Sequence, residues 1–238
     1  MKKVIYYAGI CLLFLTSCKK SQPVVNGSSS YFSFSAGSTW NYSTTDNSNG
    51  QINTYTLTAT ANDSIVNGRT YHVFNNTSSS GTTNEYYNIT GNEYYQYSEV
   101  IPQQPAVEQK YLIDNVNAGT SWTTPFFTQF DAQGTTVSIT GTIKNTIEEK
   151  GTSLTVNGIN YIGVIKVKTE LQNVSITVPF IGNLTPTIVQ SNYSYYAPKY
   201  GMVKNDLLLN VTVDVPTVGP QEVINTNSTT TLSSANIL

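Results

Sequence analysis

Several long stretches of this sequence alternate between apolar and polar residues, and this period of two constrains the fold more than any other feature. The clearest stretches are Tyr55–Ala59, Val137–Glu148, Val174–Phe180 and Leu207–Val215. Successive side chains of a strand point to opposite faces, so each stretch predicts a strand with one buried and one solvated face. No long segment of the mature chain shows the spacing of an amphipathic helix. We therefore expect an all-β domain of antiparallel strands.

Turn signals separate these stretches. Val66-Asn67-Gly68-Arg69 and Val156-Asn157-Gly158-Ile159 each place Asn-Gly between strand-like residues. Asn and Gly tolerate the positive φ that a type I′ hairpin turn requires. Strands joined in this way form antiparallel meanders, which we expect to make a curled sheet, a barrel or a half-barrel. Closure of the sheet would protect its edge strands from aggregation.

Two short motifs occur twice and in the same order. Ala36-Gly37-Ser38-Thr39-Trp40 recurs as Ala118-Gly119-Thr120-Ser121-Trp122, and these motifs contain both tryptophans of the chain. The turn segment Val66–Tyr71 recurs as Val156–Tyr161, and both segments follow the pattern Val-Asn-Gly-x-x-Tyr. An internal duplication would explain this order, with related halves at about residues 36–100 and 118–204. The alternative is chance recurrence in a β chain rich in Ser, Thr, Asn and Gly.

The N-terminus has the organisation of an export signal. Lys2 and Lys3 precede an apolar run from Val4 to Leu15, which is shorter than the roughly 20 residues needed to span a bilayer. Leu15-Thr16-Ser17-Cys18 resembles the lipobox of bacterial lipoproteins, in which the Cys is lipidated and becomes the first mature residue. The resemblance implies a signal peptide at 1–17 and anchoring to a membrane through a lipidated Cys18. The polar composition up to Ser30 predicts a lipidated tether at 18–30, and the strand patterns beyond it predict a single all-β domain at 31–238.

A second resemblance lies in the C-terminal half. Val156–Lys168 and Tyr195–Lys204 resemble the V-x-G-x-x-Y hairpin and the Y-Y-A-x-x-x-G-x-V-K strand of a group of Bacteroidetes-type outer-membrane lipoproteins. This resemblance implies a cell-envelope compartment and a β fold, but no activity. Surface-exposed lipoproteins of this phylum commonly carry acidic residues after the lipidated Cys. Here Lys19 and Lys20 follow Cys18, which favours the periplasmic face of the outer membrane.

Composition argues against several classes of function. The net charge is −2 and only 11% of the residues are charged, so we expect no nucleic-acid binding, which depends on neutralising phosphates. His72 is the only histidine, which makes a metal site or a catalytic triad a poor interpretation. Glu148 and Glu149 are adjacent, so we expect them to face opposite ways in a solvated turn. We expect no catalytic residues, no metal and no cofactor.

Two features remain as candidate sites. Asp63-Ser64-Ile65 matches the short O-glycosylation pattern of Bacteroidetes, which makes Ser64 a candidate modification site. The tyrosine-rich runs offer a candidate binding surface, since Tyr provides contact area with a polar tip; packing of the strands is the alternative interpretation. The tyrosines considered for binding are Tyr86, Tyr94, Tyr195 and Tyr196.

These observations predict a lipid-anchored, non-enzymatic binding protein of the cell envelope, with a small hydrophobic molecule as its ligand. Two alternatives remain open: a structural or interaction protein without a ligand, and a glycan-binding module that uses the tyrosine-rich strands. Apolar inward residues suit a packed core and a hollow interior equally well, so the sequence does not decide between them.

Overall fold

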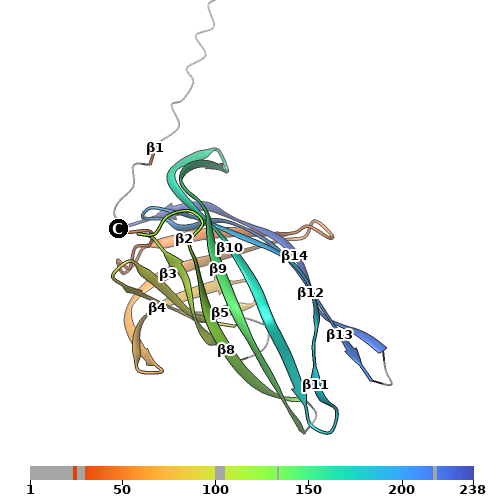
Figure 1. Ribbon diagram of the computed structural model, residues 1–238. Coiled ribbons are helices and arrows are strands. Elements are labelled where there is room, and N and C mark those ends of the chain that lie inside the picture. Colours follow the sequence, from red (N-terminus) through yellow and green to blue (C-terminus); the bar gives the residue numbers. More distant parts are fainter. Residues whose placement is uncertain (1–23, 26–29, 100–104, 133, 217–218) are drawn as a thin grey trace, which may run out of the picture.

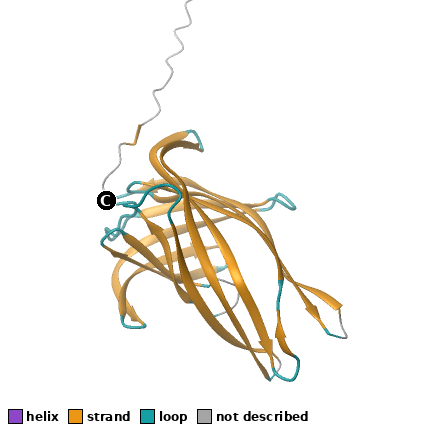
Figure 2. Cartoon of the chain, viewed as in Figure 1, coloured by secondary structure: helices purple, strands orange, loops and turns teal. Residues whose placement is uncertain are grey.

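The computed structural model describes residues 24–25, 30–99, 105–132, 134–216 and 219–238. Strands are the only regular elements in this part of the chain (Figure 2), which confirms the all-β expectation. Among these residues there is accordingly no helix long and apolar enough to cross a membrane. Cys18 and the signal peptide lie outside the described residues, so the predicted lipidation stays a prediction.

The strands are β1 (Val24–Val25), β2 (Thr39–Asp46), β3 (Ile52–Val66), β4 (Arg69–Ser78), β5 (Gly81–Thr90), β6 (Glu93–Ser98), β7 (Val107–Ile113), β8 (Ser121–Ala132), β9 (Thr135–Val156), β10 (Ile159–Val178), β11 (Gly182–Leu184), β12 (Thr187–Ala197), β13 (Gly201–Val215) and β14 (Gly219–Asn236).

Twelve of these strands follow one another in a single curled sheet, in the order β7-β6-β5-β4-β3-β2-β14-β13-β12-β10-β9-β8. All neighbours on this path are antiparallel. The sheet curls until its two end strands, β7 and β8, lie close together (Figure 1), giving a nearly closed barrel. Two six-stranded meanders, β2 to β7 and β8 to β14 without β11, are joined by a backbone ladder between β2 and β14.

The twice-occurring sequence motifs adopt matching conformations. Both Asn-Gly turns have positive φ at both residues, 50° and 80° in the first and 49° and 80° in the second. Gly37 and Gly119 share a φ of 87°. Gly37 N donates to Ala59 O, and Gly119 N donates likewise to Ile147 O. These matches are what a duplication would leave, and the duplication itself stays a prediction.

The main core fills the end of the barrel near the C-terminus. Phe32 from the segment before β2 packs there against Trp40 and Phe74, with ring centroids 5.0 and 5.1 Å apart. A smaller core lies farther along β8, β9 and β10 around Phe126 and Ile143. Residues of both cores also line the cavities described below: Phe32 and Leu57 of the main core line one, and Ile143 of the smaller core lines the other.

The structure corrects two local expectations. Phe180, assigned by alternation to a buried face, lies at the β10–β11 hairpin tip and is fully exposed. Glu148 and Glu149 lie within β9, where a bulge opposite Lys166 and Val167 places an extra residue in the strand. A bulge re-aims side chains, so the two carboxylates face the same side. Both pair with Lys166 Nζ, at 3.1 and 3.3 Å.

Candidate functional site: two chambers inside the barrel

The larger chamber is a cavity of about 490 Å³. We call it the leucine chamber. Its lining combines leucine and isoleucine side chains with side-chain amides, hydroxyls and one carboxylate, that of Glu99. The residues are Gln96, Ser98, Glu99, Gln109, Ile143, Thr169, Leu171, Gln190, Asn192, Leu207, Leu208, Leu209, Ile224 and Thr226. Its size falls within the range of small-molecule sites, which are mostly apolar with a few placed polar groups.

The leucine chamber is hollow although its strands carry core-like sequences. Leu207 and Leu209 share one face of β13 with Val211 and Val213, which are buried, yet both leucines are only partly buried. Their exposed area borders the cavity. The alternation therefore predicted correctly that Leu207 and Leu209 point into the barrel. They face a cavity there instead of a packed core.

The wall of the leucine chamber is interrupted between β10 and β12. Their ladder runs only from Ile165–Lys168 against Tyr193–Tyr196. Beyond it, the Gln190 side chain takes the place of a strand: its Oε1 accepts from Leu171 N and its Nε2 donates to Leu171 O, both at 2.8 Å. This amide satisfies the backbone where the strands splay apart.

The smaller chamber, of about 200 Å³, lies between the main core and the leucine chamber. We call it the tyrosine chamber, because five tyrosines contribute to its wall. It is lined by Phe32, Tyr42, Tyr55, Leu57, Glu85, Tyr87, Gln96, Tyr111, Tyr196, Gly201 and Met202. Gln96 lines both chambers, so the two are adjacent along the barrel axis.

Among the described residues, Glu85 is the only charged side chain that lines the tyrosine chamber. Asn76 Nδ2 donates to its Oε1 at 2.5 Å, and the Tyr87 hydroxyl donates to its Oε2 at 2.5 Å. Gln96 Nε2 in turn donates to the Tyr87 hydroxyl at 3.2 Å. A chain of hydrogen bonds therefore runs from the boundary between the chambers to the carboxylate.

Burial raises the phenol pKa values in this chamber. The pKa of Tyr196 is raised to about 12 by burial. For Tyr55, burial raises the pKa and the Glu85 charge adds to the effect. The pKa of Tyr87 is raised by burial, by the Glu85 charge and by their hydrogen bond. These phenols are hydrogen-bonding neutral groups at ordinary pH.

Beside these chambers, to whose walls β7 contributes Gln109 and Tyr111, the end strands β7 and β8 meet without a backbone ladder in the described chain. Side chains bridge this seam instead. Trp122 Nε1 donates to Lys110 O at 2.7 Å, and Asn145 Nδ2 donates to the same oxygen at 3.0 Å. The Oδ1 of Asn145 accepts from Thr169 Oγ1 at 2.6 Å. The seam is thus held at one level of the barrel, beside the chambers.

The four tyrosines considered for a binding surface do not gather in one place. Tyr196 lines the tyrosine chamber. Tyr94 is 1% exposed and belongs to the main core, so it offers no surface, because its ring packs inward and its hydroxyl donates to Asp114 at 2.5 Å. Tyr86 contacts Tyr97 on β6. Tyr195 lies beside Lys204 on β13, with Nζ 5.4 Å from its ring centroid.

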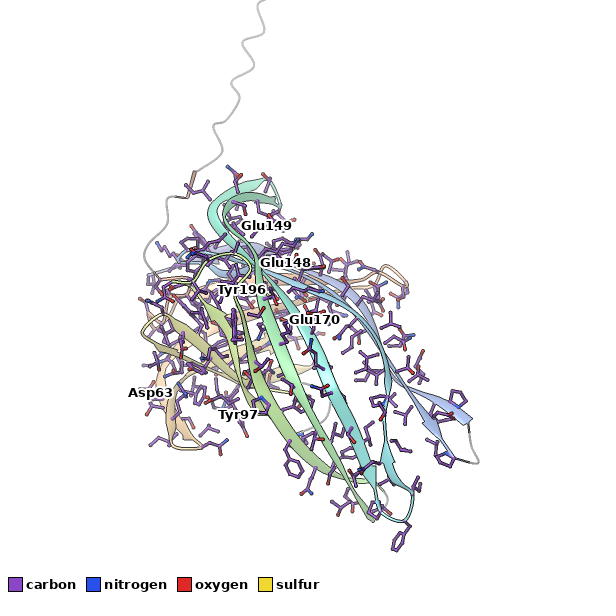
Figure 3. The ribbon with its side chains drawn as sticks, viewed as in Figure 1. Asp63, Tyr97, Glu148, Glu149, Glu170 and Tyr196 are labelled. Atoms are coloured by element: carbon purple, nitrogen blue, oxygen red, sulfur yellow. The ribbon has the colours of Figure 1, made fainter. Side chains whose placement is uncertain are left out.

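The other singled-out residues are placed outside the chambers. Ser64 lies in β3 opposite Tyr71, half-buried, and its glycosylation stays a prediction. His72 contacts Asp63 Oδ1 at 2.9 Å and Thr60 O at 2.7 Å, filling the bulge of β3. Asp63 lies at the outer edge of the view in Figure 3, away from Tyr196. No group of three metal-binding side chains occurs among the residues with described positions.

Sequence reasoning missed Glu85 and most of the chamber tyrosines. Glu85 and Tyr87 are two residues apart in β5, and therefore share a face. That spacing was a usable signal, but one carboxylate in a polar strand gives no reason to place it inside. Gln96 and Gln190 gave no signal either, since isolated glutamines in strands usually face water.

Comparisons with known proteins support the fold alone. No protein-family model and no curated protein sequence matches this chain. A structure from Parabacteroides distasonis ATCC 8503, described as a "putative lipoprotein", is similar with a TM-score of 0.52 and 14% identity, over 87% of this chain and 98% of that one. A "putative exported protein with YmcC-like fold" from Bacteroides fragilis NCTC 9343 gives a TM-score of 0.44 and 12% identity, over 86% of this chain and 98% of that one.

Proposed function

We propose that this protein is a lipid-anchored, non-enzymatic protein of the cell envelope that binds an elongated amphipathic molecule inside its barrel. The observation that carries the proposal is the leucine chamber. Its cavity of about 490 Å³ is lined by leucines that remain partly exposed inside a folded domain. Unfilled apolar surface costs stability, and a ligand with an apolar chain would recover it.

The amides of the chamber suit a ligand that is not purely apolar. Gln109 and Asn192 lie on the wall together with the leucines, and the tyrosine chamber adjoins them through Gln96. An apolar chain with a polar end matches this distribution better than a plain hydrocarbon does.

Anchoring through Cys18 to the periplasmic face of the outer membrane is part of the proposal. It is supported by the lipobox Leu15–Cys18 and by Lys19-Lys20, and by the description of the similar Parabacteroides structure as a "putative lipoprotein". One acyl chain anchors weakly and two or more anchor stably, so a multiply acylated Cys18 would keep the protein in the membrane fraction. A Cys18→Ser variant should move to the soluble fraction of the native host.

The ligand is tested with the Cys18→Ser protein, purified gently from its native host and measured by native mass spectrometry. We expect a bound hydrophobic molecule at a fixed stoichiometry. Leu209→Trp should abolish it by filling the leucine chamber. Asn210→Trp is the matched control, since Asn210 is the next residue of β13, pairs with Val189 and does not line the chamber.

The outcomes separate the candidates. A bound molecule that is lost in Leu209→Trp and kept in Asn210→Trp supports the proposal. A clean mass of the free protein, together with no binding of added amphiphiles, contradicts it. That result would favour the structural or interaction role without a ligand.

A further inference from the structure

The Glu85 carboxylate stands out because no ion-pair partner for it occurs among the described residues. Both of its oxygens accept hydrogen bonds, one from Asn76 and one from the Tyr87 hydroxyl. Arg69 and Lys110 form ion pairs with other carboxylates, Glu108 and Glu93, and neither lines the tyrosine chamber.

The walls around Glu85 also favour a positive charge. Tyr42, Tyr55, Tyr87, Tyr111 and Tyr196 surround the same space. Tyr42 and Tyr55 stack with centroids 5.0 Å apart, and Tyr111 and Tyr196 lie 5.4 Å apart. The face of an aromatic ring carries partial negative charge and attracts ammonium groups. The Glu85 carboxylate and the faces of the tyrosine rings therefore both attract a positively charged group.

We propose that the tyrosine chamber recognises a positively charged group, a primary or quaternary ammonium, at the polar end of the ligand whose apolar chain occupies the leucine chamber. This inference rests on the proposed function and adds its ligand class. A cavity of about 200 Å³ accommodates such a group. Gln96, which lines both chambers, marks the junction of the polar end with the chain.

Other polar ends fit less well. A carboxylate or phosphate would meet the Glu85 charge, with no cation among the described residues that line the chamber, and like charges at short range repel each other. A neutral hydroxyl could hydrogen-bond to Glu85, but it would leave the carboxylate charge unbalanced. The head group therefore decides affinity through its charge.

The test compares three amphiphiles of equal chain length below their micelle concentrations: decyltrimethylammonium, decanol and decanoate. Their binding to the Cys18→Ser protein is measured by isothermal titration calorimetry. We expect the cation to bind at least about tenfold more tightly than decanol, and decanoate to bind most weakly. This comparison uses the unaltered chambers, so it does not depend on the folding of a chamber variant.

Glu85→Gln keeps the shape and removes the charge: its amide oxygen still accepts from Asn76, and its NH2 group can donate to the Tyr87 hydroxyl, which can act as an acceptor. It should abolish the preference for the cation while leaving decanol binding within about twofold. Glu222→Gln, which removes one negative charge from an exposed position of β14, is the control and should keep the preference.

Each result has one meaning. Equal binding of the three probes, a preference for decanoate, or a cation preference that survives Glu85→Gln overturns this inference and leaves the proposed function standing. Absence of binding for all three probes overturns the proposed function together with the inference. A preference that Glu85→Gln removes and Glu222→Gln keeps supports it.

Discussion

Removing both side chains that bridge the β7–β8 seam should destabilise the protein by more than the sum of the two single changes. Trp122 Nε1 and Asn145 Nδ2 donate to one acceptor, the Lys110 carbonyl. When either donor is removed, the other still satisfies the carbonyl. The double change removes both donors, so a cost appears that neither single variant shows.

The expected magnitude follows from the hydrogen bonds. Trp122→Phe removes one bond and keeps much of the ring, at a cost of about 1 kcal/mol. Asn145→Leu removes two bonds, since Asn145 also accepts from Thr169 Oγ1, and should cost about 2 kcal/mol. A carbonyl left without partners adds about 1–3 kcal/mol. The double variant should therefore lose about 5 kcal/mol, with a coupling of about 2 kcal/mol.

Urea denaturation of the wild type, the two single variants and the double variant measures this coupling as a double-mutant cycle. The control cycle combines Trp122→Phe with Thr44→Val, at the laddered β2–β14 junction, where Thr44 Oγ1 and Thr230 Oγ1 lie 2.8 Å apart. Those two sites share no partner and should be additive within about 0.5 kcal/mol. If the seam pair is equally additive, the Lys110 carbonyl does not depend on these two donors and the reasoning is refuted.

Two further predictions concern the tyrosines and the glycines. Burial raises the pKa of Tyr42 well above its ordinary value and that of Tyr196 to about 12. The folded state therefore favours the neutral phenols. Their contribution to the free energy of unfolding is fully present below about pH 10 and is lost as the pH rises through about 12. Phenolate absorbance should therefore appear in two steps, the second with unfolding, whereas a single step near pH 10 would contradict the burial. Gly201 and Gly119 both have positive φ, 71° and 87°, but only at Gly201 would a Cβ meet another atom, Phe32 Cδ2 at 2.8 Å. Gly201→Ala should lower the free energy of unfolding by about 2 kcal/mol more than Gly119→Ala, and equal losses in thermal or urea unfolding would show that Phe32 moves aside without cost.

The strands and their orientation were predictable because alternation is a local property. In β9, Val137, Ile139 and Ile143 are buried as the period of two predicts. The Asn67-Gly68 and Asn157-Gly158 turns were predictable for the same reason, since only a few residue types tolerate positive φ.

The closure of the sheet and the contents of its interior were not predictable from the residues alone. Asn145 continues the inward face of β9 between Ile143 and Ile147, where alternation favours an apolar residue. Its role depends on Lys110, which lies 35 positions away in the sequence and is brought near only by closure. Glu85 was missed for a similar reason: its partner Tyr87 is local, but the other chamber tyrosines come from four other strands.

The hollow interior is better explained by the interruptions of the ladder than by a shortage of apolar residues. A backbone ladder holds neighbouring strands about 4.8 Å apart, and the diameter of a barrel grows with the circumference of its wall. Both interruptions border the leucine chamber: Gln109 lies on β7 at the seam, and Gln190 bridges the splayed β10 and β12. At these points side chains rather than ladders span the wall, so the wall is wider there. Leu207 and Leu209 then cannot reach the opposite side. Leu207 and Leu209 thus resemble core residues in sequence. They line a cavity because the barrel wall is widened at the two interruptions of the ladder.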